Sequence, residues 1–202
     1  MKMPAMQAVV KVLESEGVDV AFGIPGAAIL PLYKAMLEHG GIQHFTVRHE
    51  EGGTHAADGY SRATGKVGVA IGTSGPAGTN MVTGLYTAWA DSVPILTITG
   101  QVPLAQIDRE GFQAVDIASI VRPVVKKSFL VTEAAQLPYI FREAFRQMRV
   151  RRPGPVHIDL PLDVQQAEIS YDPDADAPLP IAMPTLPVTR AQPSAAWVPP
   201  SS

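Results

Sequence analysis

The strongest constraint on the fold is a regular alternation of short apolar runs with longer segments of helical periodicity. Strand-sized apolar runs occur at residues 18–22, 42–47, 67–73, 93–99, 128–131 and 156–160. Helical patterns alternate with them at residues 6–13, 29–37, 50–64, 76–90, 116–121 and 134–149. Strands that alternate with helices are joined by crossovers and run parallel, and Val/Ile-rich strands indicate burial on both faces. We therefore predict an α/β fold, a three-layer sandwich with a mostly parallel central sheet flanked by helices.

The alternation divides the chain into a domain and a tail. Residues 1–170 carry the pattern and are predicted to form one domain, for which a hydrophobic content of 46% supplies ample core. Residues 171–202 are rich in Pro, Ala, Asp and Ser and show no period. Such a composition is typical of a Pro-rich linker or a disordered tail.

Composition also excludes several classes of protein. The formal net charge is -3 and no basic stripe is present, so we expect no nucleic-acid partner. No apolar stretch approaches the ~20 residues of a membrane helix, and the N-terminus lacks the apolar core of a signal peptide. The absence of cysteine excludes disulfides and thiolate metal sites. We expect a soluble, cytoplasmic protein that does not bind membranes.

Unusual loops follow the first, second and third predicted strands, where ligands bind in an open parallel sheet. They lie at residues 23–27, 48–52 and 73–80. The third is Gly-rich and opens a helix, so its N–H groups could meet an anion or a polar ring, although an ordinary tight turn explains the glycines equally well. It lacks the Gly-Lys-Ser/Thr ending of a P-loop, and the chain has no G-x-G-x-x-G fingerprint.

Glu50 is the strongest candidate for a catalytic residue. Glu50 and Glu51 lie where a helix is predicted to begin, and a favourable interaction with the helix dipole explains Glu51. Glu50 follows an apolar strand directly, so its carboxylate is expected to be partly desolvated and disposed to hold or share a proton.

A series of short motifs resembles one enzyme family. The motifs are FGIPG (22–26), RHEEG (48–52), HAADGY (55–60), RATG (62–65), TSGP (73–76), TN (79–80), DSVP (91–94), GQ (100–101), FQ (112–113) and RPGPV (152–156). In this order and spacing, over residues 5–170, they resemble thiamine-diphosphate enzymes of the acetolactate synthase and glyoxylate carboligase group. The resemblance is to the N-terminal, pyrimidine-binding domain of that group.

The resemblance implies a role for each matching residue. Glu50 matches the glutamate that hydrogen-bonds N1′ of the cofactor's aminopyrimidine ring and so promotes loss of the thiazolium C2 proton. The residues that match the cofactor pocket are Pro25, Gly26, Ala27, Glu50, Thr73, Ser74, Gly75 and Asn80. Phe112 and Gln113 match a loop that reaches toward the substrate in a neighbouring subunit. Lys126 matches a cationic position at the mouth of the site, with an ordinary solvated lysine as the alternative.

The implied reaction is decarboxylation of a 2-oxo acid followed by carboligation. The segment from Phe112 to Ile117 looks more like glyoxylate carboligase than acetolactate synthase, the enzyme of branched-chain amino acid biosynthesis. Glyoxylate carboligases, however, typically carry valine in place of the glutamate that this chain keeps as Glu50. Pyruvate and glyoxylate therefore both stay open as substrates. A 2-oxo acid decarboxylase or oxidase and a non-catalytic interaction module are the alternatives.

The family's middle and diphosphate-binding domains have no counterpart in the sequence, because the Gly-Asp-Gly and downstream Asn motifs that hold Mg²⁺ are missing. We expect no metal ligands in this chain. The resemblance implies a homodimer or tetramer partner that supplies the diphosphate-binding domain with its Mg²⁺, and FAD as a further cofactor that full-length members can bind. The chain is expected to be a truncation or one part of a split enzyme, inactive alone.

Overall fold

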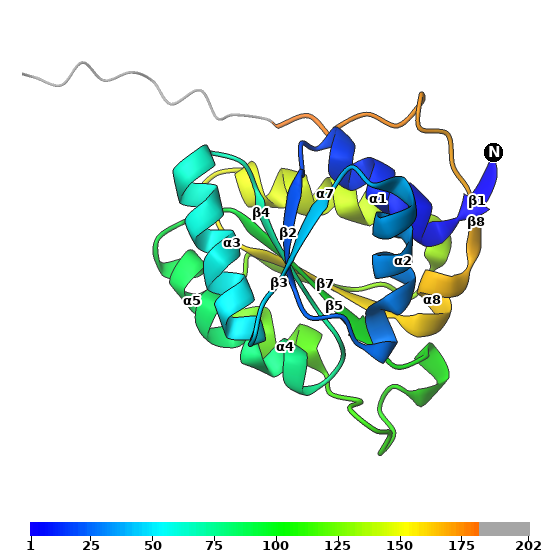
Figure 1. The fold of residues 1–202 in the computed structure, drawn as a ribbon, viewed down its shortest axis with the longest axis horizontal. Coiled ribbons are helices and arrows are strands. Elements are labelled where there is room, and N and C mark those ends of the chain that lie inside the picture. Colours follow the sequence, from blue (N-terminus) through cyan, green and yellow to red (C-terminus); the bar gives the residue numbers. More distant parts are fainter. Residues whose placement is uncertain (182–202) are drawn as a thin grey trace, which may run out of the picture.

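The computed structural model of the protein describes residues 1–181; residues 182–202 of the predicted tail lie outside the described part. A six-stranded sheet with the order β3-β2-β4-β5-β7-β6 forms its centre, and every neighbouring pair is parallel (Figure 1). Its strands are β2 Val20–Gly23, β3 Gln43–Thr46, β4 Gly68–Gly72, β5 Ile95–Gln101, β6 Lys127–Leu130 and β7 Val156–Pro161. The prediction of a parallel α/β sheet is confirmed.

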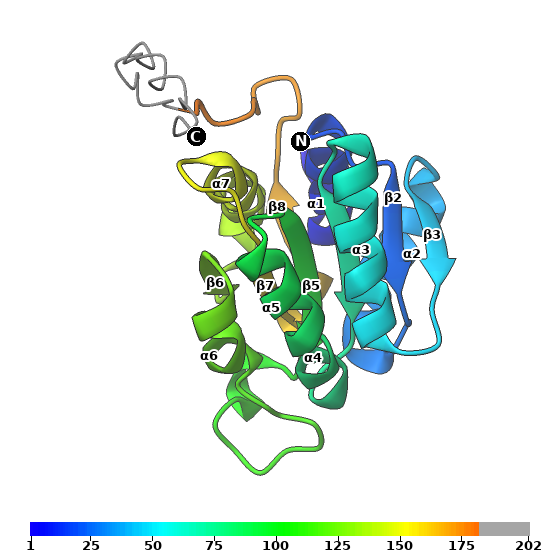
Figure 2. The same cartoon turned by 90° about the vertical axis from the view of Figure 1, so that its left-hand side faces the viewer.

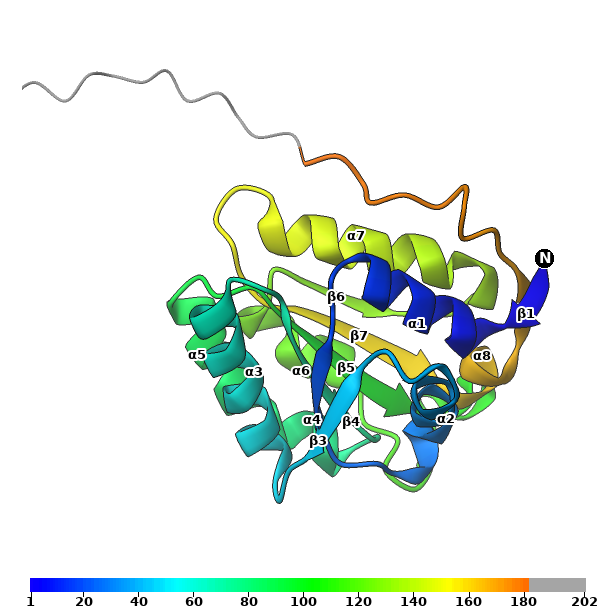
Figure 3. The ribbon, with the colours of Figure 1, turned by 45° about the horizontal axis from the view of Figure 1, so that its top comes forward.

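Helices cover both faces of this sheet, as a three-layer sandwich requires (Figure 3). One face packs against α1 Ala5–Ser15, α2 Leu30–His39, α7 Leu137–Arg149 and α8 Leu162–Gln166. The other packs against α3 Glu50–Thr64, α4 Pro76–Asn80, α5 Val82–Ala90 and α6 Ile117–Val121. Short 3-10 turns occur at Ala27–Ile29, Leu104–Gln106, Arg122–Val124 and Ala134–Gln136. None of the described helices is long and apolar enough to cross a membrane.

Local sequence explains where the helices begin and which side they bury. The apolar positions of α1, Met6, Val9, Val10 and Leu13, are all buried, as their spacing predicts. Helix α3 begins at Glu50, since the ring of the preceding His49 accepts a hydrogen bond from the Glu51 N–H at 3.3 Å. The two glutamates of its first turn also interact favourably with the helix dipole.

Two parts of the fold differ from the prediction. The helix expected over residues 76–90 is divided into α4 and α5, because the Met81 N–H bonds to Gly78 O at 3.2 Å in a tight turn. A small antiparallel ribbon was not predicted; in it β1 Lys2–Pro4 pairs with β8 Glu168–Ser170. Strands of three residues are too short for a period to be recognised.

The chain continues to pack against the domain just beyond residue 170. Tyr171 is buried, and its hydroxyl donates to Asp176 at 2.7 Å. Asp176 in turn pairs with the buried Arg142 of α7 at 2.8 Å, and Arg142 also pairs with Glu16 at 2.9 Å. The described start of the proposed linker thus supplies a carboxylate partner to Arg142, a buried cation on α7.

A polar hydrogen-bond network lies within the sheet, on the face covered by α6. The buried Thr99 contacts His157 Nε2 at 2.8 Å and donates to Asp159 Oδ1 at 2.6 Å. Ser128 lies 2.9 Å from His157 Nδ1 on the other side. Burial without a neighbouring opposite charge raises the pKa of Asp159 to about 7 and lowers the pKa of His157 to about 3.

These two pKa shifts predict opposing effects of pH on stability. Protonated Asp159 contributes to the free energy of unfolding. This contribution is complete below its unfolded pKa of 3.8 and is lost as pH rises to about 7. That of His157 is complete above its unfolded pKa of 6.5 and is lost as pH falls to about 3. Each proton changes the free energy of unfolding by about 1.4 kcal/mol per pH unit, so the two slopes offset each other in the native chain.

Single substitutions should separate the two effects. In Asp159→Asn, the free energy of unfolding from urea titrations should rise with pH more steeply than in the native chain, between about pH 4 and 6.5. In His157→Gln it should instead fall with pH relative to the native chain over the same interval. Parallel pH profiles for all three proteins would show that neither group titrates in the folded state as described.

Candidate functional site

The three loops singled out in the sequence meet at one edge of the sheet. Strands β2, β3 and β4 are neighbours, so the residues that follow them converge at their carboxyl ends. The Ile24 N–H bonds to Ile71 O at 3.3 Å, and the Val47 N–H bonds to Gly23 O at 3.2 Å. The backbone itself thus joins the starts of these loops.

The turn after β2 lies directly against the loop after β4. A Cβ placed on Gly26 would lie 2.5 Å from Thr73 Cβ, so only glycine allows this approach. The Ala28 N–H donates to Thr73 Oγ1 at 3.3 Å. Pro25 and Ala27 flank Gly26 and are exposed. The structure therefore brings the predicted residues Pro25, Gly26 and Ala27 together with Thr73.

Glu50 and Asn80 also meet at this edge, although 30 residues separate them in the sequence. Asn80 Nδ2 donates to Glu50 Oε2 at 3.0 Å, and Glu50 is half-buried at the first turn of α3. The Glu50 side chain passes close to Gly72, where an added Cβ would lie 3.6 Å from Glu50 Cγ. The carboxylate is thus oriented by a donor from α4, next to the end of β4.

Ser74 and Gly75 contact the loop that carries Phe112 and Gln113. Ser74 Oγ lies 3.4 Å from Gln113 Oε1, and a Cβ on Gly75 would lie 2.8 Å from Gln113 Cβ. Gly75 has a φ of 63° and Gln113 a φ of 59°, so both residues have the positive φ that a sharp change of chain direction requires. Phe112 is 87% exposed. Gln113 therefore joins the second wall of the site, whereas the Phe112 ring extends into solvent.

Lys126 is the one predicted site residue that the structure does not bring to this edge. It precedes β6, at the amino end of the sheet, and its Nζ donates to Val150 O. Burial and the nearby charges of Arg146 and Arg151 lower its pKa. Within this chain Lys126 caps the loop after α7, and a place near substrate stays a prediction for an assembled enzyme.

Two residues that the sequence did not single out, Tyr33 and His44, form a pair between α2 and β3. Tyr33 Oη is 3.1 Å from His44 Nε2, and the two rings meet edge to face with centroids 4.9 Å apart. Burial and the charge of Glu50 raise the pKa of Tyr33, and burial lowers that of His44. Tyr33 lies on the apolar stripe of α2, so its position in the sequence predicts a core residue and gives no sign of a functional hydroxyl.

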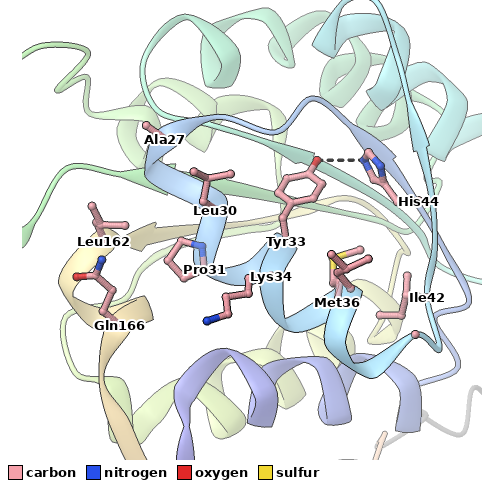
Figure 4. Close-up of a pocket in the computed structure, with 12 residues that line it drawn as sticks. Ala27, Leu30, Pro31, Tyr33, Lys34, Met36, Ile42, His44, Leu162 and Gln166 are labelled. Carbon is pink, nitrogen blue, oxygen red and sulfur yellow. Dashed lines mark hydrogen bonds between the residues drawn. The ribbon is translucent and has the colours of Figure 1, made fainter.

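A groove on the surface beside α2 is separate from Glu50. It is a mainly apolar groove of about 980 Å³, lined among others by Ala27, Leu30, Met36 and Leu162 (Figure 4). Tyr33 and His44 lie at its wall, and Glu50 is not among its lining residues. Of the predicted cofactor-pocket residues, Ala27 also lines this groove. Within residues 1–181, no group of three or more His, Asp or Glu side chains could hold a metal ion.

Comparison with known proteins places this geometry in a family. A sequence family described as "Thiamine pyrophosphate enzyme, N-terminal TPP binding domain" matches residues 3–120, which include Glu50, Asn80 and Gln113. Glyoxylate carboligase from Escherichia coli O157:H7 is 58% identical over 91% of this chain and 31% of that protein. Acetolactate synthase from Arthrospira platensis is 52% identical over 82% of this chain and 29% of that protein.

A third relative is the acetolactate synthase large subunit of Lactococcus lactis, which is 47% identical over 86% of this chain and 30% of that protein. The chain thus spans about a third of the length of these relatives. The family match covers more than half of the chain and includes all three loops that meet at the carboxyl edge. This chain belongs to the thiamine pyrophosphate enzymes, as their N-terminal, TPP-binding domain.

Proposed function

We propose that this chain binds the aminopyrimidine half of thiamine pyrophosphate and, within a longer enzyme, serves decarboxylation of a 2-oxo acid followed by carboligation. The observation that carries the proposal is the Glu50 carboxylate, half-buried at the carboxyl edge of the sheet and oriented by Asn80. Membership of the family supports the same cofactor.

The side chains at this edge fit an aminopyrimidine ring. Glu50 Oε2 accepts from Asn80, whereas Oε1 has no hydrogen-bond partner in the described chain and can face a ring nitrogen. Gly26 packs directly against Thr73, which brings the turn after β2 and the loop after β4 together as one wall of the site. When bound, the cofactor supplies the electron sink that decarboxylation needs.

The role that we propose for Glu50 is to share a proton with the ring nitrogen N1′. A half-buried carboxylate makes a stronger hydrogen bond than one in water, because the local dielectric is lower. Asn80 donates to one oxygen only and so keeps the other oxygen directed at the ring. Tyr33, whose hydroxyl bonds to His44, has a pKa that burial and the charge of Glu50 raise, so it stays a neutral hydroxyl.

The role of Glu50 predicts a large effect of Glu50→Gln, which keeps the shape but cannot exchange a proton. In the enzyme assembled with a diphosphate-binding domain, hydrogen exchange at thiazolium C2, followed by NMR, should slow about 10²–10⁴-fold. Carboligation should fall by a similar factor.

The matched control is Glu51→Gln, a neighbouring carboxylate that pairs with His55 at 3.7 Å and does not bond to Asn80. Its C2 exchange should stay within a factor of two of the wild type. Equal exchange rates in the Glu50 variant and the wild type would refute the proposed role. An assembled wild-type enzyme without any carboligation would favour a non-catalytic interaction module instead.

The close approach of Gly26 to Thr73 predicts that Gly26→Ala weakens cofactor binding. The added Cβ would overlap Thr73, which should cost about 1–3 kcal/mol in the free energy of unfolding and displace the turn. Isothermal titration with thiamine pyrophosphate should register a lower affinity of the assembled enzyme. Gly59→Ala is the control, since an added Cβ there meets nothing within 4 Å and a helix interior favours alanine. Unchanged stability and affinity in Gly26→Ala would count against this placement of the ring.

Two substrates have support, and we propose pyruvate, the substrate of an acetolactate synthase type of carboligase. Glu50 favours this type, because glyoxylate carboligases typically carry valine at the matching position. The 58% identity to glyoxylate carboligase and the segment from Phe112 to Ile117 favour glyoxylate as the second candidate. We expect kcat/KM for pyruvate to exceed that for glyoxylate in the assembled enzyme, and the reverse order would select glyoxylate carboligase.

We further propose a partner subunit that supplies the diphosphate-binding domain and its Mg²⁺. The exposed Phe112 ring, next to Gln113 at the edge of the site, supports a contact with another subunit or domain at this end. A homodimer or tetramer of the longer enzyme would provide such a contact.

A further inference from the structure

Gln101, the last residue of β5, has a side chain that is buried and fully hydrogen-bonded. Its Nε2 donates to Asp159 Oδ2 at 2.9 Å and to Val115 O at 2.8 Å, and its Oε1 accepts from the Val102 N–H at 2.9 Å. Gln101 is 3% exposed. Both amide hydrogens are therefore used, and the amide cannot be flipped, because a reversed amide would face Val102 with a donor.

Val115 belongs to the loop that connects β5 to α6 and carries Gln113. Half of the residues in 103–116 are exposed, and the loop projects from the domain at the bottom of Figure 2. The Val115 N–H bonds to Gln113 O at 3.1 Å, so the two residues share one tight turn. The bond from Gln101 to Val115 thus holds the backbone two residues from the side chain that contacts Ser74.

The other end of the loop is held separately. The Leu104 N–H donates to the Asp163 carboxylate at 3.1 Å, close to the start of α8. Between these two anchors, residues 105–114 make mainly local turns. The position of Gln113 against Ser74 and Gly75 therefore depends on the anchor at Val115.

Asp159 orients Gln101. It is 1% exposed, and its two carboxylate oxygens accept from different donors, Oδ1 from Thr99 and Oδ2 from Gln101. Asp159 Oδ2 accepts a hydrogen bond, so the Gln101 amide must turn its NH₂ group and not its oxygen toward Asp159. A residue at 159 that keeps an oxygen on the side of Gln101 should preserve the anchor.

We propose that Gln101 is a positioning residue that, oriented by Asp159, anchors the loop of residues 103–116 and so places Gln113 at the Glu50 edge. The anchoring follows from the contacts above, whereas its value for substrate turnover rests on the proposed function.

The anchor is tested by amide hydrogen exchange, measured residue by residue in the 202-residue chain. Gln101→Leu removes all three side-chain hydrogen bonds and should speed exchange in residues 111–116 about tenfold or more, while α1 and α3 stay protected. Gln106→Leu is the control, since this exposed glutamine lies in the same loop and its side chain has no hydrogen-bond partner within residues 1–181. Its exchange should match the wild type.

Two milder variants keep the test decisive if Gln101→Leu unfolds the whole domain. Gln101→Asn is one methylene shorter and cannot reach Asp159 and Val115 together, so it should also loosen residues 111–116. Asp159→Asn keeps an acceptor for Gln101, so its loop should stay protected as in the wild type. Wild-type exchange in Gln101→Asn, or loosening in Asp159→Asn equal to that in Gln101→Asn, would overturn the proposal.

Kinetics of the assembled enzyme separate the anchor from the proposed function. If Gln113 serves the substrate, Gln101→Asn should raise KM for the 2-oxo acid several-fold more than it changes kcat. A loosened loop with unchanged KM would overturn the substrate role and leave the anchor standing. A wild-type enzyme that lacks carboligation would refute the proposed function, independently of the exchange result.

Discussion

The candidate site depends on one constraint, the common direction of the six strands. Because they are parallel, the loops after β2, β3 and β4 all begin at the same edge, and residues far apart in sequence become neighbours there. Glu50 and Asn80 meet because one opens α3 and the other ends α4, both beside the end of β4. An antiparallel strand among these three would have sent one loop to the opposite edge.

Parallel strands also require apolar residues on both faces, which makes the polar network of β5 and β7 unusual. Asp159 and His157 lie on the face toward α6, where within residues 1–181 neither forms a salt bridge and both are hydrogen-bonded to neighbouring hydroxyl and amide groups. Such groups are tolerated because every one of them is hydrogen-bonded. Through Gln101 the network extends from the centre of the sheet to the loop that carries Gln113.

Much of this arrangement could be predicted from the sequence, since it depends on period and on order along the chain. The start of α3 at Glu50 and the placement of three loops at one edge follow from alternating strands and helices. The Tyr33–His44 pair could not be predicted, because it depends on the rotation of α2 against an edge strand. Lys126 matched a family position, yet it precedes a strand, and the residue before a parallel strand lies at the edge opposite Glu50. His157 and Asp159 alternate with apolar residues in β7. This pattern fits a strand with one exposed face as well as a strand with a buried polar network, so the sequence could not distinguish the two.

The row of groups from Ser128 through His157 and Thr99 to Asp159 has a further consequence. With Asp159 ionised, each hydrogen bond in the row points toward the carboxylate, and His157 carries its proton on Nε2. When Asp159 takes up a proton, Thr99 can donate to His157 instead, and the imidazole proton moves to Nδ1. Every contact persists with its direction reversed. The interior of the sheet can thus accommodate either charge state of Asp159 by exchanging one tautomer for another, without moving a strand.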